Sequence, residues 1–545
     1  MKTTSRRWGT IITFVVGVAA LAGFLVGCSD DDERLDIGPE PSAITVEQLI
    51  FNPKSPAPGD TMQATAVVTA STQNIGDFVS YSWSNSGGTL IENNLSSVRW
   101  VAPTNSGVFT LTCTASNSVN SSTESENVFV GSLLDLITSR AGEMYPRTDN
   151  TMIYLSPPAD ADSGVIVRQL DLTTGEDVVV FPAEEKAGSQ YSFDAEAQHA
   201  GHMLVERAFQ QKLTVVYDDI AGGIQTVIAR DPRPFSPEVT RPNEFSSPYV
   251  AHDGTGLTYQ GSLLDQEATP AQGGVDTFAV YIYDIVASTT QRATFVGDNF
   301  YPSFSSDANY LVYIANHEGT FEWEFYSLPL DNMVAKADTS AGKLVKLTDS
   351  GGLFGSESIP PEPVPFLWNP QPGTPVLAAL ATDDRIWLIN PAGGDGTPVD
   401  IPGRIVDGVW SNDGQTLAVS SFDGDASRAS IHLVNLSGGA TLLYQALERD
   451  RIGLLTWSPE DTYLVYTVDR SGEIWYELYD VEGSTGLTKP ARITPAWVPG
   501  FAVDYGSPLM TLRSSWMRMP GSVTAYLFFL DQDTPRVMSL DLSGI

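Results

Sequence analysis

Internal repetition constrains the fold of this chain more than any other feature of its sequence. One unit recurs: an aromatic residue, a turn rich in Ser, Asp and Gly, an apolar strand, a loop, and a second strand that ends near Asp with Gly soon after. The strongest copies begin at Phe304, Trp410 and Trp457, and weaker copies begin at Tyr145, Phe193, Tyr249, Trp368 and near Leu512. A recurring unit of this size indicates a repeat architecture, so it must be interpreted before any local motif.

Each unit has the chemistry of a small antiparallel sheet. Alternating apolar residues make the strands, while Asp bonds its own backbone and Gly adopts positive φ in the tight turns. One such sheet cannot bury both of its faces, whereas several sheets packed around an axis can. We therefore predict an all-β chain in which residues 132–545 form a β-propeller of seven or eight blades, and the eight repeat starts favour eight.

The ends of the repeat region predict how such a ring would close. Residues Leu133 to Thr138 are mostly apolar and precede the first repeat, whereas the last repeat, ending at Ile545, has room for only three strands. A strand borrowed from before the first repeat would complete the last blade and leave no open sheet edge.

The preceding segment, residues 43–131, has the pattern of a small β-sandwich. Strand-like runs recur at short spacing with turn signals between them, as in Met62 to Ala70 and Val79 to Trp83. Trp83 in a middle strand, and the run from Gly107 to Thr112 late in the segment, resemble the bacterial immunoglobulin-like and PKD-like modules. The resemblance implies a module that spaces a functional domain away from a membrane.

The repeat itself resembles the blades of TolB-like propellers and, less closely, the WD-repeat group. The resemblance is carried by turns such as Trp410-Ser411-Asn412-Asp413-Gly414. The runs Leu344 to Thr348 and Ala491 to Thr494 resemble the outer strand that precedes the next blade in TolB-like propellers.

The N-terminus predicts the location of the protein. Lys2, Arg6 and Arg7 precede a mostly apolar, uncharged run in residues 11–26, which is typical of a secretory signal in residues 1–27. The ending Leu25-Val26-Gly27-Cys28 resembles the lipobox of bacterial lipoproteins, and this resemblance implies that Cys28 becomes the first mature residue and carries the lipid. The alternative is a transmembrane anchor, for which the run is short.

Residues 28–42 have the composition of an acidic tether, and their dense like charge predicts that this segment is disordered. Ser29 directly after Cys28 resembles lipoproteins released to the outer membrane, and the run Ser29-Asp30-Asp31-Asp32 resembles a surface-export tag. The chain carries a formal charge of −36, and removal of residues 1–27 takes away three positive charges and no acids, which leaves −39. This charge argues against binding to nucleic acid, and it leaves membrane attachment to the lipid on Cys28.

Catalytic signatures are scarce. The sequence has no His-Glu-x-x-His, no Gly-x-Ser-x-Gly and no complete phosphate loop. The histidines are His199, His202, His252, His317 and His432. His199 and His252 fall in turns between first and second strands, His317 in a loop at the opposite face, and His432 within a strand, so we expect no shared metal and mostly solvated turn histidines. His199-x-x-His202 remains an alternative, weak metal site.

Calcium and thiol chemistry are also weakly indicated. Asp383-Asp384 and Asp423-Gly424-Asp425 offer oxygen ligands but lack a full calcium-loop spacing, so we predict no cofactor, with one structural calcium ion as the alternative. With Cys28 lipidated, Cys113 has no partner for a disulfide bond. Its alternating run predicts a small buried apolar residue.

The best functional lead is a set of loop aromatics. Loops entering each blade, together with loops between second and third strands, gather at one end of a propeller. The aromatic residues that we predict there as partner-binding are Phe245, Phe300, Tyr301, Phe354, Trp497, Phe501 and Tyr505. Clustered exposed aromatics mark binding surfaces, although each could instead pack onto its own blade.

From these observations we expect a lipid-anchored protein of the cell envelope, favoured at the outer membrane. Its propeller would act as a non-catalytic scaffold that binds a macromolecular partner, most readily a protein. The alternatives are a propeller enzyme acting on polysaccharide, as a lyase or glycosidase, and a glycan-binding protein without turnover.

Overall fold

The structure is a computed structural model, and all its described residues lie in strands, turns or loops. Within them, no helix has the length and apolarity needed to cross a bilayer. The described residues run from 43 to 541 apart from gaps at 55, 71–77, 135–143, 148–150, 157–165, 182–189, 195–196, 207–211, 231–244, 263–277, 296, 318–321, 332–333, 336–343, 356–365, 425–426, 482–488, 495–514, 519–523 and 532–533.

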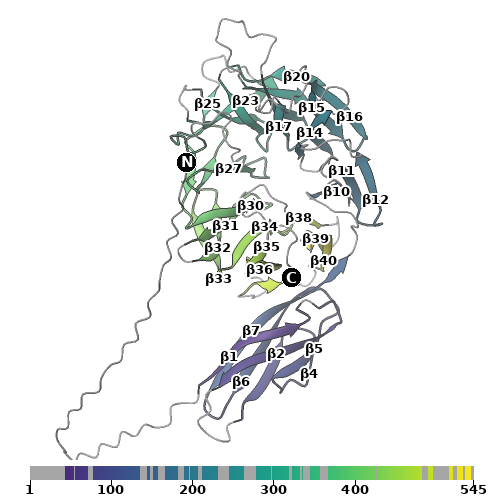
Figure 1. Cartoon of the computed structure of the whole chain (residues 1–545), viewed down its shortest axis with the longest axis vertical. Coiled ribbons are helices and arrows are strands. Elements are labelled where there is room, and N and C mark those ends of the chain that lie inside the picture. Colours follow the sequence, from purple (N-terminus) through teal and green to yellow (C-terminus); the bar gives the residue numbers. More distant parts are fainter. Residues whose placement is uncertain are drawn as a thin grey trace, which may run out of the picture.

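Two sheets form a sandwich at the N-terminal end of the described chain (Figure 1). The first sheet has the order β1-β2-β5-β4, and its strands are β1 (Ile44–Asn52), β2 (Thr61–Ala70), β5 (Ser97–Val101) and β4 (Thr89–Ile91). The second has the order β3-β6-β7, and its strands are β3 (Ser80–Asn85), β6 (Gly107–Ser116) and β7 (Ser121–Val130). The strands expected from the sequence are therefore present.

The sandwich has one core, to which both sheets contribute. Trp83 from β3, Trp100 from β5 and Cys113 from β6 are all buried in it. Each indole N–H is satisfied: Trp83 donates to the carbonyl oxygen of Leu95 at 2.9 Å and Trp100 donates to that of Gly87 at 2.8 Å. Cys113 is fully buried, as predicted, and burial raises the pKa of its thiol to about 11.

The rest of the described chain forms eight sheets arranged in a ring (Figure 1). This is the eight-bladed propeller that the repeat predicted. The strands of blades 1 to 4 are β9 (Met144–Pro146), β10 (Thr151–Ser156), β11 (Ile166–Asp171) and β12 (Asp177–Phe181); β13 (Gln190–Phe193), β14 (His199–Glu206), β15 (Lys212–Asp219) and β16 (Ile224–Arg230); β17 (Phe245–Val250), β18 (Gly256–Ser262), β19 (Phe278–Asp284) and β20 (Thr289–Arg292); β21 (Asn299–Phe304), β22 (Tyr310–Ala315), β23 (Glu324–Asp331), β24 (Val334–Ala335) and β25 (Val345–Lys346).

The second half of the ring repeats the same antiparallel order. The strands of blades 5 to 8 are β26 (Phe366–Trp368), β27 (Leu377–Leu380), β28 (Ile386–Ile389) and β29 (Thr397–Val399); β30 (Arg404–Trp410), β31 (Thr416–Asp423), β32 (Arg428–Asn435) and β33 (Ala440–Glu448); β34 (Arg451–Trp457), β35 (Tyr463–Arg470), β36 (Glu473–Asp480) and β37 (Ala491–Arg492); β38 (Ser515–Arg518), β39 (Thr524–Asp531), β40 (Thr534–Asp541) and β8 (Ser132–Leu134).

Blade 8 closes the ring with a borrowed strand. β8, which precedes the first repeat, pairs antiparallel with β40, so that Leu133 lies opposite Met538 and Leu134 opposite Val537. This pairing is the closure predicted from the sequence. Residues 135–138 of the predicted closing segment lie outside the described part.

The repeated serine explains the turn that opens each strong copy. In blade 6, Thr416 N–H donates to Ser411 Oγ at 3.0 Å, while Ser411 Oγ donates to Asp413 at 2.7 Å. In blades 4 and 7, Tyr310 N–H and Tyr463 N–H donate to Ser305 Oγ and Ser458 Oγ, each at 3.0 Å. Because these serines are buried, their hydroxyl groups satisfy a backbone donor that water does not reach.

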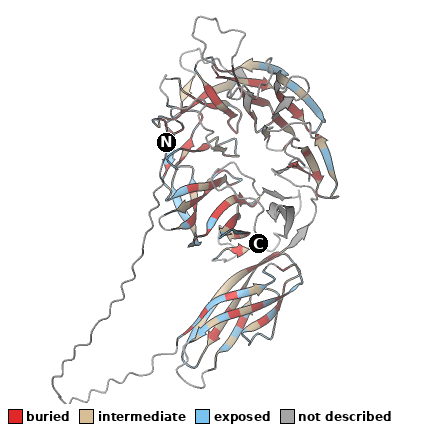
Figure 2. Cartoon of the chain, viewed as in Figure 1, coloured by how far each residue is buried: buried red, intermediate tan, exposed pale blue. Residues whose placement is uncertain are grey.

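Buried residues lie along the strands of the propeller blades (Figure 2), and their apolar side chains form clusters that join neighbouring blades. One cluster joins Leu380 of blade 5 to Trp410 of blade 6, and the next joins Ile431 of blade 6 to Trp457 of blade 7. A threonine two residues after the outer strand adds a repeated polar link within the blade. Thr294, Thr348 and Thr494 each accept a hydrogen bond from a backbone N–H of the third strand.

Candidate functional site

The predicted aromatic surface lies only partly within the described residues. Trp497, Phe501 and Tyr505 lie outside them. Phe245 is the first residue of β17, and the structure describes its backbone only. The remaining three predicted residues, Phe300, Tyr301 and Phe354, can be placed.

Phe300 and Phe354 are fully buried, so their predicted exposure is wrong. Phe300 packs against Phe278 of blade 3, with ring centroids 4.8 Å apart, and edge-on to Trp323, at 5.3 Å. Phe354 packs edge-on to Phe325 at 4.9 Å. Both rings belong to one apolar cluster that spans neighbouring blades, and in this conformation they offer no surface to a partner.

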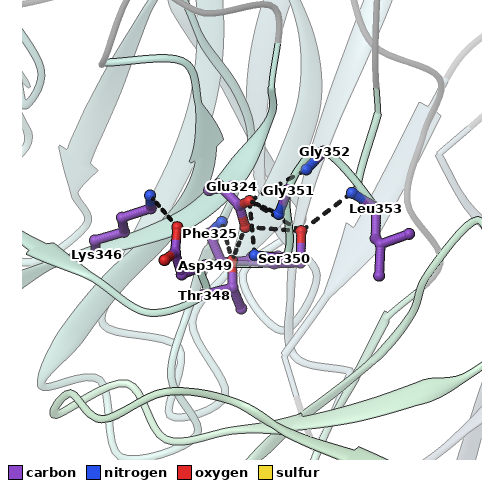
Figure 3. Close-up of polar contacts among 9 residues, drawn as sticks. All are labelled: Glu324, Phe325, Lys346, Thr348, Asp349, Ser350, Gly351, Gly352 and Leu353. Atoms are coloured by element: carbon purple, nitrogen blue, oxygen red, sulfur yellow. Dashed lines mark hydrogen bonds and ion pairs between the residues drawn. The ribbon is translucent and has the colours of Figure 1, made fainter.

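A buried carboxylate holds the loop that leads to Phe354 (Figure 3). Glu324 is 3% exposed and accepts hydrogen bonds from Ser350 N–H at 2.8 Å, Gly351 N–H at 3.0 Å and Thr348 Oγ1 at 2.5 Å. Ser350 Oγ adds bonds to both oxygens of the carboxylate, at 2.9 and 3.0 Å. These bonds hold the loop that carries Phe354, and Gly351 and Gly352 allow it by adopting φ of 70° and 89°. Glu324 therefore acts as a structural clamp.

Tyr301 is half-buried, so among the predicted aromatics whose side chains are described it is the one that is partly exposed. It lies at a β-bulge in β21 with a φ of 51°, and its N–H donates to Gln260 Oε1 of blade 3 at 2.8 Å. β34 has a corresponding bulge, where Leu455 N–H donates to Asp407 of blade 6 at 2.7 Å. Bulges redirect side chains and are common next to functional sites.

His199 is not the freely solvated turn residue that the sequence predicted. His199 Nδ1 lies 2.9 Å from an oxygen of Asp194, and this hydrogen bond raises the pKa of His199. His252, in the next blade, and His432, in β32, have pKa values lowered by burial. His317 packs edge-on to Tyr326, with ring centroids 4.7 Å apart.

The metal-site candidates contain no ready set of ligands. In the described ranges, no group of three or more His, Cys, Asp or Glu side chains could hold a metal ion. Asp383 instead forms an ion pair with Arg385 at 2.6 Å, and Asp384 lies 4.0 Å from Arg404. The side chain of His202 and residue Asp425 are not among the described atoms, so their metal alternatives stay predictions.

The sandwich and blade 7 share one sheet, a feature that sequence reasoning missed. β7 pairs in parallel with β37, so that Val128 lies opposite Arg492 and the two parts form a seven-stranded sheet. Asn127 Nδ2 donates to the carbonyl oxygen of Lys489 at 2.7 Å, and the Lys489 ammonium group forms an ion pair with Glu124. The two strands were visible in the sequence separately, but no local pattern indicates a pairing across more than 360 residues.

Charged and aromatic groups gather on blade 7 close to this junction. The guanidinium carbons of Arg470 and Arg492 lie 5.2 and 4.6 Å from the ring centroid of Trp475. Trp475 Nε1 donates to Glu477 at 2.9 Å, and Tyr466 Oη donates to the other carboxylate oxygen at 3.2 Å. Burial raises the pKa of Glu477, partly opposed by these two hydrogen bonds.

The comparisons with known proteins place the chain in no family. No protein-family model matches it, and no curated protein matches it. TolB from Acinetobacter baumannii is 11% identical with a TM-score of 0.28, covering 75% of this chain and 80% of that one. An oligogalacturonate lyase in complex with manganese is 10% identical with a TM-score of 0.40, covering 74% of this chain and 89% of that one.

Peptidase structures are similar at the same distant level. Dipeptidyl peptidase 4 from Porphyromonas gingivalis is 11% identical with a TM-score of 0.42, covering 65% of this chain and 52% of that one. The chain spans about half the length of that structure and of a structure from a study of two prolyl endopeptidases, of which it covers 54%. At these identities and TM-scores the likeness assigns no activity, and the propeller fold of this chain rests on its own strand pairing.

Proposed function

We propose that this chain is a lipid-anchored protein of the cell envelope whose propeller binds a macromolecular partner as a non-catalytic scaffold. The lipid is attached at Cys28 and the outer membrane is the favoured location. The partner is an envelope macromolecule, most readily a protein, and the sandwich holds the propeller away from the membrane surface.

The sheet shared by β7 and β37 carries this proposal. A flexible linker would leave the propeller free to tumble, whereas backbone pairing between two domains fixes their relative orientation. Asn127 and Glu124 reinforce the pairing from the sandwich side through their contacts with Lys489. A rigid mount of this kind favours presentation of one propeller surface to a partner at a defined position.

Site-specific crosslinking in intact cells tests the proposal. A photoreactive residue in place of Tyr301, which lies on the predicted binding surface, should form a discrete adduct that mass spectrometry identifies. The same residue at Val286, an exposed position in the turn between β19 and β20, is the matched control and should give none. Trp497→Ala combined with Phe501→Ala should weaken capture without changing the thermal midpoint.

Two further measurements test the lipid anchor at Cys28 and the alternative that the propeller is an enzyme. Cys28→Ser should abolish incorporation of labelled palmitate and leave a precursor that retains its signal peptide, and unchanged labelling would refute the lipid anchor. Purified protein should show no turnover on a panel of neutral and acidic glycans. Turnover above background would replace the scaffold by the alternative enzyme, a lyase or glycosidase.

A further inference from the structure

A polar pocket lies where the turn before β34 meets the hairpin between β35 and β36. It has a volume of about 310 Å³ and is lined by Arg449, Arg451, Asp469, Ser471 and Gly472. This volume is at the lower end of the range found for small-molecule sites, ~300 to 1,000 Å³. Every side chain in the lining is polar or charged, so the pocket suits a hydrated ligand with several hydroxyl groups rather than an apolar one.

An ion pair between a buried carboxylate and a half-exposed arginine supports the pocket. Asp450, between the two lining arginines, is 3% exposed and accepts two hydrogen bonds from Arg470, each of 2.7 Å. This bidentate pair ties the turn before β34 to the end of β35. Because Asp450 is directed into the protein, its two neighbours in sequence, Arg449 and Arg451, are exposed at the pocket.

The two lining arginines are available for a ligand. In the described part of the chain neither forms an ion pair with a carboxylate, although the protein has a large excess of acids, 66 Asp and Glu against 30 Lys and Arg. Arg451 lies over the ring of Phe422, at 5.9 Å from its centroid. Arg449 has a φ of 73°, which is unusual for a residue with a side chain, and its N–H donates to the carbonyl oxygen of Ser427 at 2.7 Å.

Asp469 gives the pocket a second kind of chemistry. One of its oxygens accepts the N–H of Gly472 at 2.9 Å, which holds the hairpin turn and fixes the carboxylate at the pocket. A carboxylate beside two arginines lowers the affinity for a simple anion such as sulfate, because it repels negative charge. It is a strong acceptor for hydroxyl groups, and the exposed hydroxyl of Ser471 can serve the same ligand.

We propose that this pocket binds an acidic saccharide through one uronic acid unit. Arg449 and Arg451 bind the sugar carboxylate, while Asp469 and Ser471 bind ring hydroxyls. This inference goes beyond the proposed function, because it adds a saccharide ligand at blade 7, whereas the predicted partner-binding residue Tyr301 lies in blade 4. An acidic peptide fits less well, since peptide segments also bury apolar groups, for which this pocket has no apolar side chain.

Titration of the detergent-solubilised full chain with glucuronate and with glucose, at physiological salt, tests the proposal. Glucuronate should bind and glucose should bind at least about tenfold more weakly, as expected for loss of a charge-assisted contact. Arg449→Ala and Arg451→Ala should each weaken glucuronate binding by a factor of about ten or more. Arg404→Ala is the matched control, because Arg404 begins β30 as Arg451 begins β34, and it should leave binding unchanged.

Asp469→Asn distinguishes a saccharide from a simple anion. The amide keeps an acceptor oxygen for Gly472 but removes the negative charge. Sulfate binding should strengthen in this variant, whereas glucuronate binding should weaken because the hydroxyl groups lose their best acceptor. Equal binding of glucose and glucuronate, no binding of glucuronate, or parallel strengthening of both anions would each overturn the proposal.

These outcomes are separable from the fate of the proposed function. If the pocket fails these tests while the crosslink at Tyr301 still forms, the scaffold proposal stands and only this ligand is removed. If the crosslink fails while glucuronate binds, the protein is a glycan-binding module. A thermal midpoint measured for every variant ensures that lost binding is not lost folding.

Discussion

The sandwich and the propeller bury their apolar side chains in two different ways. The sandwich has a single core that both of its sheets fill, including Trp83 and Trp100. Each described apolar cluster of the propeller instead draws on at least two neighbouring blades. From this difference we expect the sandwich to fold as a local unit. Among the described side chains no blade has a separate apolar cluster, so we expect the ring to fold as a whole.

Two tryptophans of equal burial test this comparison with the largest expected effect. Trp100→Ala in the sandwich and Trp323→Ala in the propeller each remove a side chain with 0% exposure and should cost about 3–5 kcal/mol. In calorimetry, Trp100→Ala should lower a sandwich transition and leave most of the propeller transition in place. Trp323→Ala should lower the propeller transition as one cooperative unit.

A different result would break the comparison. If Trp323→Ala split the propeller transition into separate steps, the blades would have independent cores. If Trp100→Ala lowered both transitions equally, the sandwich and propeller would be one cooperative unit joined through β7 and β37.

The pairing of β7 with β37 predicts that a substitution there changes the stability of both regions, by less than either tryptophan substitution does. Asn127→Ala removes the 2.7 Å hydrogen bond to the carbonyl oxygen of Lys489 and should cost about 1 kcal/mol. Chemical denaturation followed by the fluorescence of the two regions should show both transitions shifting by similar amounts. Arg99→Ala, at an exposed position of β5 in the other sheet, is the control and should shift neither. A shift confined to the sandwich would mean that β7 does not support blade 7.

The same contrast explains how much the sequence could predict. The repeat starts at Phe304, Trp410 and Trp457 could be predicted, because the serine turn after each aromatic is formed by residues that are adjacent in the sequence. The closing strand was readable for the same reason, since Leu133 and Leu134 lie next to the repeat region. Eight blades followed from counting such local signals.

Features that depend on distant partners were missed or misplaced. Phe354 follows a glycine-rich loop and looks exposed in sequence, but its loop is held inward by Glu324, which lies 30 positions earlier on another strand. Phe300 is buried because Phe278 and Trp323 approach it from neighbouring elements. The pairing of β7 with β37 and the Arg449–Arg451 pocket likewise depend on the assembled fold.

Glu477 offers a pH-dependent test that is confined to the propeller. Because burial raises its pKa in the folded protein, its contribution to stability is fully present below the ordinary carboxyl pKa and declines as pH rises through the raised value. Glu477→Gln should remove this decline and be as stable as the parent protein, or more stable, at neutral pH. The free energy of unfolding measured from pH 4 to pH 8 checks this.

Two controls sharpen the result for Glu477. Glu473→Gln, at an exposed position of the same strand, should leave the pH profile unchanged. Glu477→Leu should destabilise the propeller at every pH, because Trp475 Nε1 and the hydroxyl of Tyr466 lose their acceptor. A fall in stability of Glu477→Gln at neutral pH would show that the ionised carboxylate is favoured in the fold.

The smallest expected effect is in the reactivity of Cys113, the thiol at the centre of the sandwich core. In a Cys28→Ser background Cys113 is the only thiol of the chain, and its burial, together with a pKa raised to about 11, makes modification depend on opening of the sandwich. Labelling with a disulfide reagent should therefore be slow in the parent protein and no faster in Trp323→Ala, because a defect between blades leaves the sandwich core intact.

Trp100→Ala is the positive control and should accelerate labelling by a factor of a hundred or more, about tenfold for each 1.4 kcal/mol of lost stability. Acceleration in Trp323→Ala comparable to that in Trp100→Ala would mean that opening of the ring opens the sandwich as well, and the two regions would then differ in how they bury apolar groups but not in how they unfold.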